Sequence, residues 1–181
     1  MTSQPRLTLT VCTAFCVALL SLAAGAGAQT AEWKSYPYPA DGFQASFPIS
    51  PELQKKDLPT EKGTVQLHSY IAQEASAAMF VGVCDYGDKA ASMDAEKQLQ
   101  GAKNAILQNP GSHLLSERKI SLGASPGLEF EAQSDTSFFT ARIYMVGSTL
   151  YQTLVITPLG KTYADTTRFL DSFQLIAKSE N

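Results

Sequence analysis

The sequence has 181 residues, of which 44% are hydrophobic and 17% are charged, and its formal net charge is −3. The length favours one domain, and the composition excludes a disordered tail protein and a coiled coil. Its densest basic cluster is Lys55-Lys56, whereas proteins that bind nucleic acids or anionic membranes concentrate positive charge. We therefore expect no nucleic acid and no membrane surface as partner.

Residues 1–28 have the pattern of a secretory signal peptide. Arg6 is followed by an uncharged apolar stretch over residues 7–22 and by the small-residue cleavage site Ala26-Gly27-Ala28. An uncleaved membrane anchor is the alternative, because residues 7–28 are long enough to span a bilayer. Ala and Gly in the last third of this stretch favour cleavage. The prediction is a single exported domain over residues 29–181, periplasmic or secreted, without a membrane anchor.

The positions of the cysteines fit the division into a leader and a mature chain. Cys12 and Cys16 lie in the leader, so Cys84 is alone in the mature chain and no disulfide can form within one mature molecule. Cys84 lies in an apolar stretch that is typical of a strand, which predicts a buried thiol. Pairing with a second molecule is the alternative.

The first half of the mature chain alternates between apolar and polar residues, a pattern typical of strands. Residues 33–38 are extended, and Pro37 and Pro39 suit the edge of a sheet. The turn signal Asp41-Gly42 precedes a strand over residues 43–47. Further strands are predicted over residues 53–58, 64–72 and 78–86.

Two helices are predicted from apolar residues at helical spacing. The first spans about 92–108, where Ala95, Leu99, Ala102 and Ile106 form one stripe and Asp94 and Glu96 lie in the first turn. The second follows Thr162 and Asp165, which fit a capping pattern. Its apolar residues are Phe169, Leu170 and Phe173.

Four strands are predicted between these helices, over residues 114–122, 128–133, 138–146 and 150–157. Gly147-Ser148 joins the last two in a type II′ pattern. Both faces of these two strands are apolar, so each face must be covered. The sequence therefore predicts an α+β fold, with a mostly antiparallel β-sheet sandwiched between helices.

Three segments together resemble the PsbP-like family, which is named for an extrinsic subunit of the photosynthetic oxygen-evolving complex. They are Gly42-Phe43 with Phe47-Pro48, residues 142–147 with 150–152, and residues 168–173. The pattern of Arg-x-Tyr, a Gly turn, a second Tyr strand and Phe-Leu-x-Ser-Phe looks like that of exported bacterial members without an assigned function.

The resemblance implies an α-β-α sandwich around an antiparallel sheet and no catalytic residues. Members of the family resemble binding or assembly proteins, including the photosystem subunit and a nuclear protein that binds the GTPase Ran. No residue in this chain marks photosynthesis or Ran specifically, so neither partner is carried over.

Residues 123–127 match G-x-S-x-G, the nucleophile elbow of α/β-hydrolases. Pro126 lacks the backbone N–H that an oxyanion hole requires after the nucleophile. No histidine follows Ser125, and the residues after Pro126 alternate like a strand instead of a helix. We interpret this motif as a turn between strands.

The remaining polar residues give no catalytic, cofactor or metal site. His68 and His113 lack metal-ligand spacing, and His68 shares a strand face with Gln66 and Tyr70. That pattern indicates a surface or hydrogen-bonded histidine. Two carboxylate pairs, Asp85 with Asp88 and Glu129 with Glu131, are interpreted as solvated groups, although the glutamates share a face and are a conceivable acid pair.

The sequence therefore favours a non-enzymatic exported protein that binds an unknown envelope protein or a small ligand. The alternative is an enzyme or a metal or ligand carrier whose site is assembled from residues distant in sequence. Trp33, Tyr36 and Tyr38 are candidate partner contacts, because aromatic side chains on a stiff, proline-containing segment are favoured binding anchors. The competing interpretation is that Trp33 and Tyr36 cover the protein's own sheet or a helix.

Overall fold

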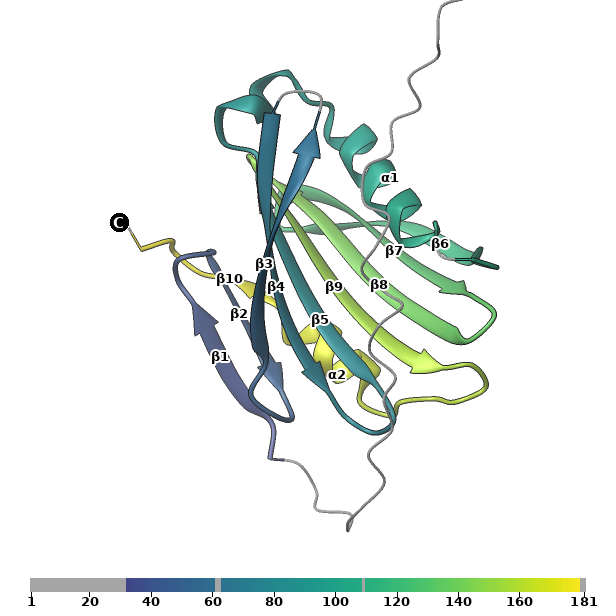
Figure 1. The fold of residues 1–181 in the computed structure, drawn as a ribbon. Coiled ribbons are helices and arrows are strands. Elements are labelled where there is room, and N and C mark those ends of the chain that lie inside the picture. Colours follow the sequence, from purple (N-terminus) through teal and green to yellow (C-terminus); the bar gives the residue numbers. More distant parts are fainter. Residues whose placement is uncertain (1–31, 61–62, 109, 180–181) are drawn as a thin grey trace, which may run out of the picture.

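The computed structural model describes residues 32–60, 63–108 and 110–179 (Figure 1). The predicted signal peptide over residues 1–28, and the cleavage site before Gln29, lie outside these ranges. Within them, no helix is long and apolar enough to cross a membrane.

A seven-stranded sheet is the largest element, and every neighbouring pair of its strands is antiparallel. The predicted strands are confirmed with bounds shifted by a few residues. In spatial order, they are β3 (Glu52–Thr60), β4 (Gly63–Gln73), β5 (Ala78–Asp85), β9 (Thr149–Pro158), β8 (Ser137–Val146), β7 (Ser125–Gln133) and β6 (His113–Leu122).

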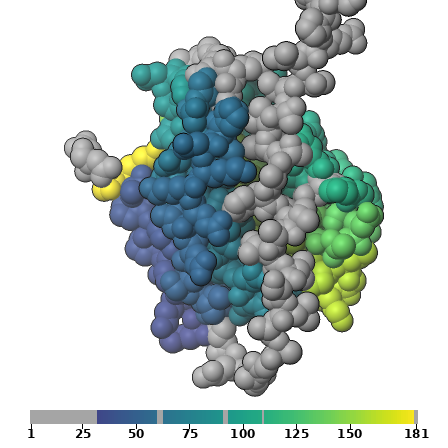
Figure 2. Space-filling model, viewed as in Figure 1, coloured from purple at the N-terminus to yellow at the C-terminus, as the bar shows by residue number. Residues whose placement is uncertain are grey.

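A second, three-stranded sheet has the order β1 (Lys34–Tyr38), β2 (Phe43–Phe47) and β10 (Gln174–Leu175). The predicted turn at Asp41-Gly42 closes the β1–β2 hairpin, and Gly42 adopts a φ of +72°, which a residue with a side chain rarely adopts. Figures 1 and 2 show this hairpin beside the β3–β4 hairpin, and the 4.0 Å separation of the Tyr38 and Tyr70 rings places them in contact.

The first predicted helix is confirmed as α1 (Ala95–Ile106). Asp94 precedes this helix instead of lying in its first turn, and its side chain accepts a 2.9 Å hydrogen bond from the backbone N–H of Lys97. The residues shortly before α1 form a 3₁₀ helix, η1 (Gly87–Ser92). The helix is therefore shorter at its start than the sequence predicted.

The second helix, α2 (Thr166–Asp171), differs from the prediction at its start. Its N-cap is Asp165, which makes no capping hydrogen bond through its side chain, so the predicted role of Thr162 as a cap was wrong. The Thr166 hydroxyl instead donates to the carbonyl of Tyr163 at 2.8 Å. The apolar side chains predicted here are buried: Phe169, Leu170 and, just after the helix, Phe173.

Each face of the large sheet has its own buried cluster. This was predicted from β8 and β9, which carry apolar residues on both faces. One cluster packs under α1 and includes Leu99, Leu128, Phe130, Phe139 and Ile143. The other lies under the three-stranded sheet and α2 and includes Phe43, Phe47, Tyr151, Phe169 and Phe173. A helix therefore covers one face, and a small sheet with a short helix covers the other. The predicted sandwich between helices is confirmed only in part.

The β8–β9 hairpin brings functional groups to one end of the large sheet. Val146 pairs with Thr149, so Gly147 and Ser148 form the predicted two-residue turn, and Gly147 has a φ of +56°. This turn lies near the β1–β2 turn, because the Tyr151 hydroxyl donates to the backbone carbonyl of Asp41 at 2.8 Å.

Candidate functional site

Two adjoining hollows lie where the β1–β2 turn, the β8–β9 turn and the segment after β10 meet. The larger has a volume of about 330 Å³ and the smaller about 130 Å³. Lys178 lines both of them, so the two hollows share one side chain. We take this pair of hollows as the candidate site.

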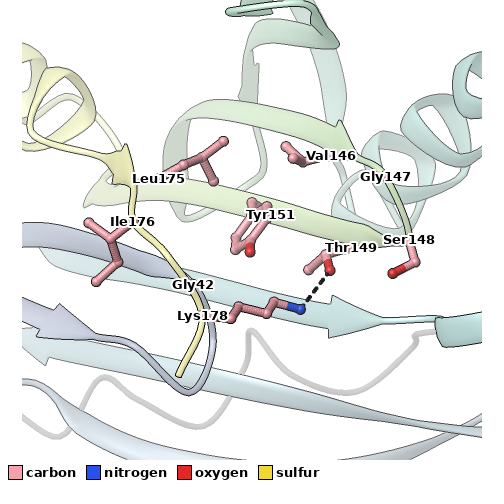
Figure 3. Close-up of a pocket in the computed structure, with 9 residues that line it drawn as sticks. All are labelled: Gly42, Val146, Gly147, Ser148, Thr149, Tyr151, Leu175, Ile176 and Lys178. Atoms are coloured by element: carbon pink, nitrogen blue, oxygen red, sulfur yellow. Dashed lines mark hydrogen bonds between the residues drawn. The ribbon is translucent and has the colours of Figure 1, made fainter. Parts of the chain in front are cut away.

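The larger hollow combines an apolar wall with hydrogen-bonding groups (Figure 3). Its apolar side chains are Val146, Leu175 and Ile176, and Leu175 is 38% exposed. The polar side chains are those of Ser148, Thr149, Tyr151 and Lys178, and the glycines are Gly42 and Gly147. Figure 3 shows Lys178 extending toward Thr149, whose hydroxyl accepts a 3.2 Å hydrogen bond from its ammonium group.

The smaller hollow is lined by Asp41, a residue that is only 8% exposed. His68 Nδ1 lies 2.8 and 2.9 Å from the two carboxylate oxygens of Asp41, and the Tyr70 hydroxyl donates to Oδ2 at 2.5 Å. A carboxylate only accepts hydrogen bonds, so Nδ1 of His68 carries a proton. His68 Nε2 lies 2.8 Å from the side-chain oxygen of Gln66. The prediction of a hydrogen-bonded histidine on this strand face is confirmed.

The tyrosines beside the two hollows remain protonated at neutral pH. Burial, together with the hydrogen bond to Asp41, raises the pKa of Tyr70 well above its ordinary value. Burial, followed by the nearby charge of Asp85, raises the pKa of Tyr151 to about 12. Both hydroxyls therefore act as hydrogen-bond donors in the site.

Asp85 connects the large sheet to the segment after β10. Its carboxylate accepts hydrogen bonds from Lys178 Nζ at 2.6 Å, from the Ser148 hydroxyl at 2.9 Å and from the Gly87 N–H at 2.9 Å. Burial alone raises the pKa of Asp85, but these hydrogen bonds outweigh it, so the pKa is lowered overall. Asp85 therefore remains an anion paired with Lys178, more fully bonded than the solvated turn residue that we predicted.

The three predicted contact residues pack against the protein's own core. Tyr38 and Tyr36 are half-buried and contact Phe43 and Phe47, with ring centroids 5.0 and 6.0 Å apart. Trp33 is half-buried, and the Arg168 guanidinium lies 4.7 Å from its ring centroid. Only Tyr38 approaches the candidate site, through the Tyr70 ring. A role for these three residues in partner binding stays a prediction.

The other residues singled out in the sequence lie elsewhere. Ser125 begins β7 and pairs with Leu122, so the predicted turn is confirmed only at Gly123-Ala124 and the rest of the motif belongs to the strand. Cys84 is buried, as predicted. His113 lies on β6, at the opposite end of the sheet order from the β3–β4 pair that carries His68.

Glu129 and Glu131 do not act as a pair of free acids. Glu129 accepts hydrogen bonds from Arg118 at 2.7 Å and from Arg142 at 2.6 Å, and Arg142 also contacts Asp171. Glu131 instead accepts from Ser116 at 3.2 Å. Glu129 is thus the centre of an ion-pair network on the sheet, instead of the solvated group that we expected.

The described residues contain no group of three or more His, Cys, Asp or Glu side chains placed to hold a metal ion. The chemistry that the site supports is hydrogen bonding and ion pairing, with one apolar wall. The sequence did not indicate that Asp41 and Lys178 belong to it, because their partners are distant: His68 is 27 residues from Asp41, and Lys178 is 93 residues from Asp85.

No family model matches the sequence, and no curated protein matches it. Among solved structures, it is similar to the solution structure of cyanobacterial PsbP (CyanoP) from Synechocystis sp. PCC 6803. The two share 12% sequence identity with a TM-score of 0.52, over 85% of this chain and 98% of that one. At this identity the similarity concerns the fold alone, and it agrees with the resemblance found in the sequence. This chain has a PsbP-like fold.

Proposed function

We propose that this chain is an exported, non-enzymatic binding or accessory protein of the cell envelope, and that it binds its partner at the two hollows. The signal-peptide pattern of residues 1–28 supports export. Fixed polar groups support binding, because hydrogen bonds to Asp41 hold the His68 ring and the Tyr70 hydroxyl in place.

The observation that carries this proposal is the composition of the larger hollow. Binding sites combine apolar walls with a few fixed polar groups that give orientation. Leu175 supplies exposed apolar surface, while Thr149 and Lys178 supply a hydroxyl and a cation. Its volume of about 330 Å³ is at the small end for a ligand pocket. The hollow therefore fits one or two side chains of a protein partner better than a large cofactor.

Two measurements test this proposal. The intact mass of the exported protein is expected to correspond to a chain that begins at Gln29. Lysine-reactive crosslinking in the native envelope, followed by mass spectrometry, is expected to link Lys178 to a defined second protein. Lys119 on β6 is the internal control, because its side chain is 76% exposed but lies on the far edge of the sheet.

Two results would overturn the proposal. A protein that retains residues 1–28 would contradict export as a cleaved protein. Crosslinks from Lys119 as frequent as those from Lys178, or no defined partner from either lysine, would contradict binding at the hollows.

A ligand carrier or an enzyme is the second candidate function, and the Asp41–His68 pair favours it. A carboxylate that orients an imidazole is a common arrangement for general acid–base chemistry. His68 lines the smaller hollow, so a small ligand there would contact it. His68→Gln is the test: loss of a measured activity or of a bound small molecule, with unchanged folding, would favour this candidate over the first.

A further inference from the structure

Residues 174–179, which we call the strap, are the last described part of the chain. Phe173 is buried, whereas every strap residue except Ile176 is exposed. The strap therefore adds almost nothing to either core. Segments with few buried contacts open at a small fraction of the free energy of global unfolding.

The strap is held by a short set of polar contacts. Its backbone pairs with β2 at only two positions, and the N–H groups of Ile176 and Ser179 donate to the carbonyls of Gly42 and Pro39, each at 3.0 Å. Lys178 adds its hydrogen bonds to Asp85 and Thr149. The Lys178 and Asp85 side chains are 44% and 46% exposed, and ion pairs this exposed are weak.

The strap also covers the candidate site. Leu175, Ile176 and Lys178 line the larger hollow, and Lys178 alone of the three lines the smaller one as well. Figure 3 shows the strap passing Gly42 with the Lys178 side chain lying across the site. Withdrawal of the strap would leave Asp85 without its cation and would uncover Thr149.

We propose that the strap is a displaceable internal ligand, and that the partner binds through an extended segment whose lysine replaces Lys178 on Asp85. The charges support a basic group, because Asp41 and Asp85 both face the smaller hollow. The backbone carbonyls of Gly42 and Pro39 and the edge of β2 would accept the partner's main chain, as they accept the strap. This inference rests on the proposed binding function and specifies its partner.

The strap itself supplies the probe for this proposal. A capped peptide with the sequence of Gln174–Ser179 is titrated into an isotope-labelled chain that ends at Phe173. The covalent link to Phe173 gives the strap an effective concentration of millimolar order. If the strap is bound in the intact chain, the free peptide must therefore bind with a dissociation constant of about 10 mM or below. We expect saturable shifts of the Asp85 and Thr149 amide signals.

The controls isolate the lysine and the carboxylate. A peptide with methionine at the position of Lys178 is expected to bind about threefold more weakly, because it lacks the charged donor of this exposed ion pair. Asp85→Asn in the shortened chain is expected to remove the difference between the two peptides. The intact chain is expected to bind the lysine peptide about tenfold more weakly than the shortened chain does, because its own strap competes.

Absence of saturable shifts, equal binding of the two peptides, or equal binding by the intact and shortened chains would overturn the proposal. If the shortened chain does not fold, the intact Lys178→Met variant takes its place, and the lysine peptide must bind it more tightly than it binds the unaltered chain. None of these peptide experiments measures partner crosslinking, so failure here is distinguishable from failure of the proposed function.

Discussion

The Tyr70 hydroxyl donates a 2.5 Å hydrogen bond to the Asp41 carboxylate, which joins the large sheet to the β1–β2 turn. Tyr70→Phe leaves this buried carboxylate with one donor fewer. We expect the free energy of unfolding to fall by about 1–3 kcal/mol, as for hydrogen bonds to charged groups. Urea denaturation measures this change.

Tyr36→Phe is the matched control for Tyr70→Phe. The Tyr36 hydroxyl makes no hydrogen bond with another described residue, so we expect this variant to unfold like the unaltered protein. Equal effects of the two substitutions would show that the Tyr70–Asp41 hydrogen bond does not stabilise the turn.

The ion pair between Glu129 and Arg142 is expected to make stability depend on pH. Their side chains are only 20% and 19% exposed. Burial raises the pKa of Glu129, but hydrogen bonds from Arg142 and Arg118 outweigh it and lower the pKa below its ordinary value of 4.5. The resulting stabilisation is complete above that value and is lost as the pH falls through the lower pKa of the folded state.

Glu129→Gln is therefore expected to destabilise the protein by about 1–3 kcal/mol at neutral pH. The difference in the free energy of unfolding between this variant and the unaltered protein should become smaller at acidic pH. Glu131→Gln is the control, because among the described residues only Ser116 donates a side-chain hydrogen bond to Glu131. Denaturation at about pH 7 and about pH 3 measures both variants. A Glu129→Gln deficit that stays the same at the two pH values would contradict this explanation.

Two glycines with positive φ allow the contact between the strap and the β1–β2 turn to be measured. A Cβ at Gly42 would lie 2.8 Å from Lys178 Cγ and 3.1 Å from the Tyr151 hydroxyl, whereas a Cβ at Gly147 would meet no atom within 4 Å. Gly147→Ala is expected to cost about 1–2 kcal/mol through backbone strain alone. Gly42→Ala is expected to cost more, because Lys178 must also move.

The extra cost of Gly42→Ala should shrink when it is combined with Lys178→Ala, which removes the crowded side chain. A double-mutant cycle of thermal unfolding measures this coupling. If Gly42→Ala lowers stability by the same amount in the presence and in the absence of the Lys178 side chain, Lys178 does not crowd position 42.

The Cys84 residue is 3% exposed on β5, so its thiol should react only when the sheet opens. We expect a thiol reagent to label it slowly in the folded protein and rapidly after denaturation. Ser121→Cys in a Cys84→Ser background gives an exposed thiol for comparison. Labelling of folded Cys84 as fast as that of the thiol introduced by Ser121→Cys, or a covalent dimer on a non-reducing gel, would refute a protected thiol.

Local patterns predicted most of the strands, because alternation within a few residues determines which face of a strand is buried. Residues 43–47 and 138–146 illustrate this, and their predicted bounds are nearly those of β2 and β8. The predicted start of α1 was less accurate, because two positions suit Asp94. At the N-cap its side chain accepts a hydrogen bond from a free backbone N–H, and in the first turn its negative charge is favourable.

The site could not be predicted in the same way. Lys178 lies in an exposed segment without periodicity, and its partner Asp85 becomes a neighbour only after two sheets have formed. His68 was correctly placed on a face with Tyr70, but nothing local indicated Asp41 as their shared acceptor. The sequence predicted α2 on the second sheet face but not the small sheet beside it, because nothing local showed that β1 and β2 leave the large sheet and pair with β10, which has only two residues.

The central claim is that the partner binds at the two hollows beside Lys178, and site-specific photo-crosslinking in the native envelope tests it most directly. A photoreactive side chain replaces Ala40, which is exposed and lines the smaller hollow, or Gln54, which is exposed on the opposite face of the large sheet. We predict a single crosslinked partner from position 40 and none from position 54. Crosslinks of equal yield from both positions, or from position 54 alone, would contradict the claim.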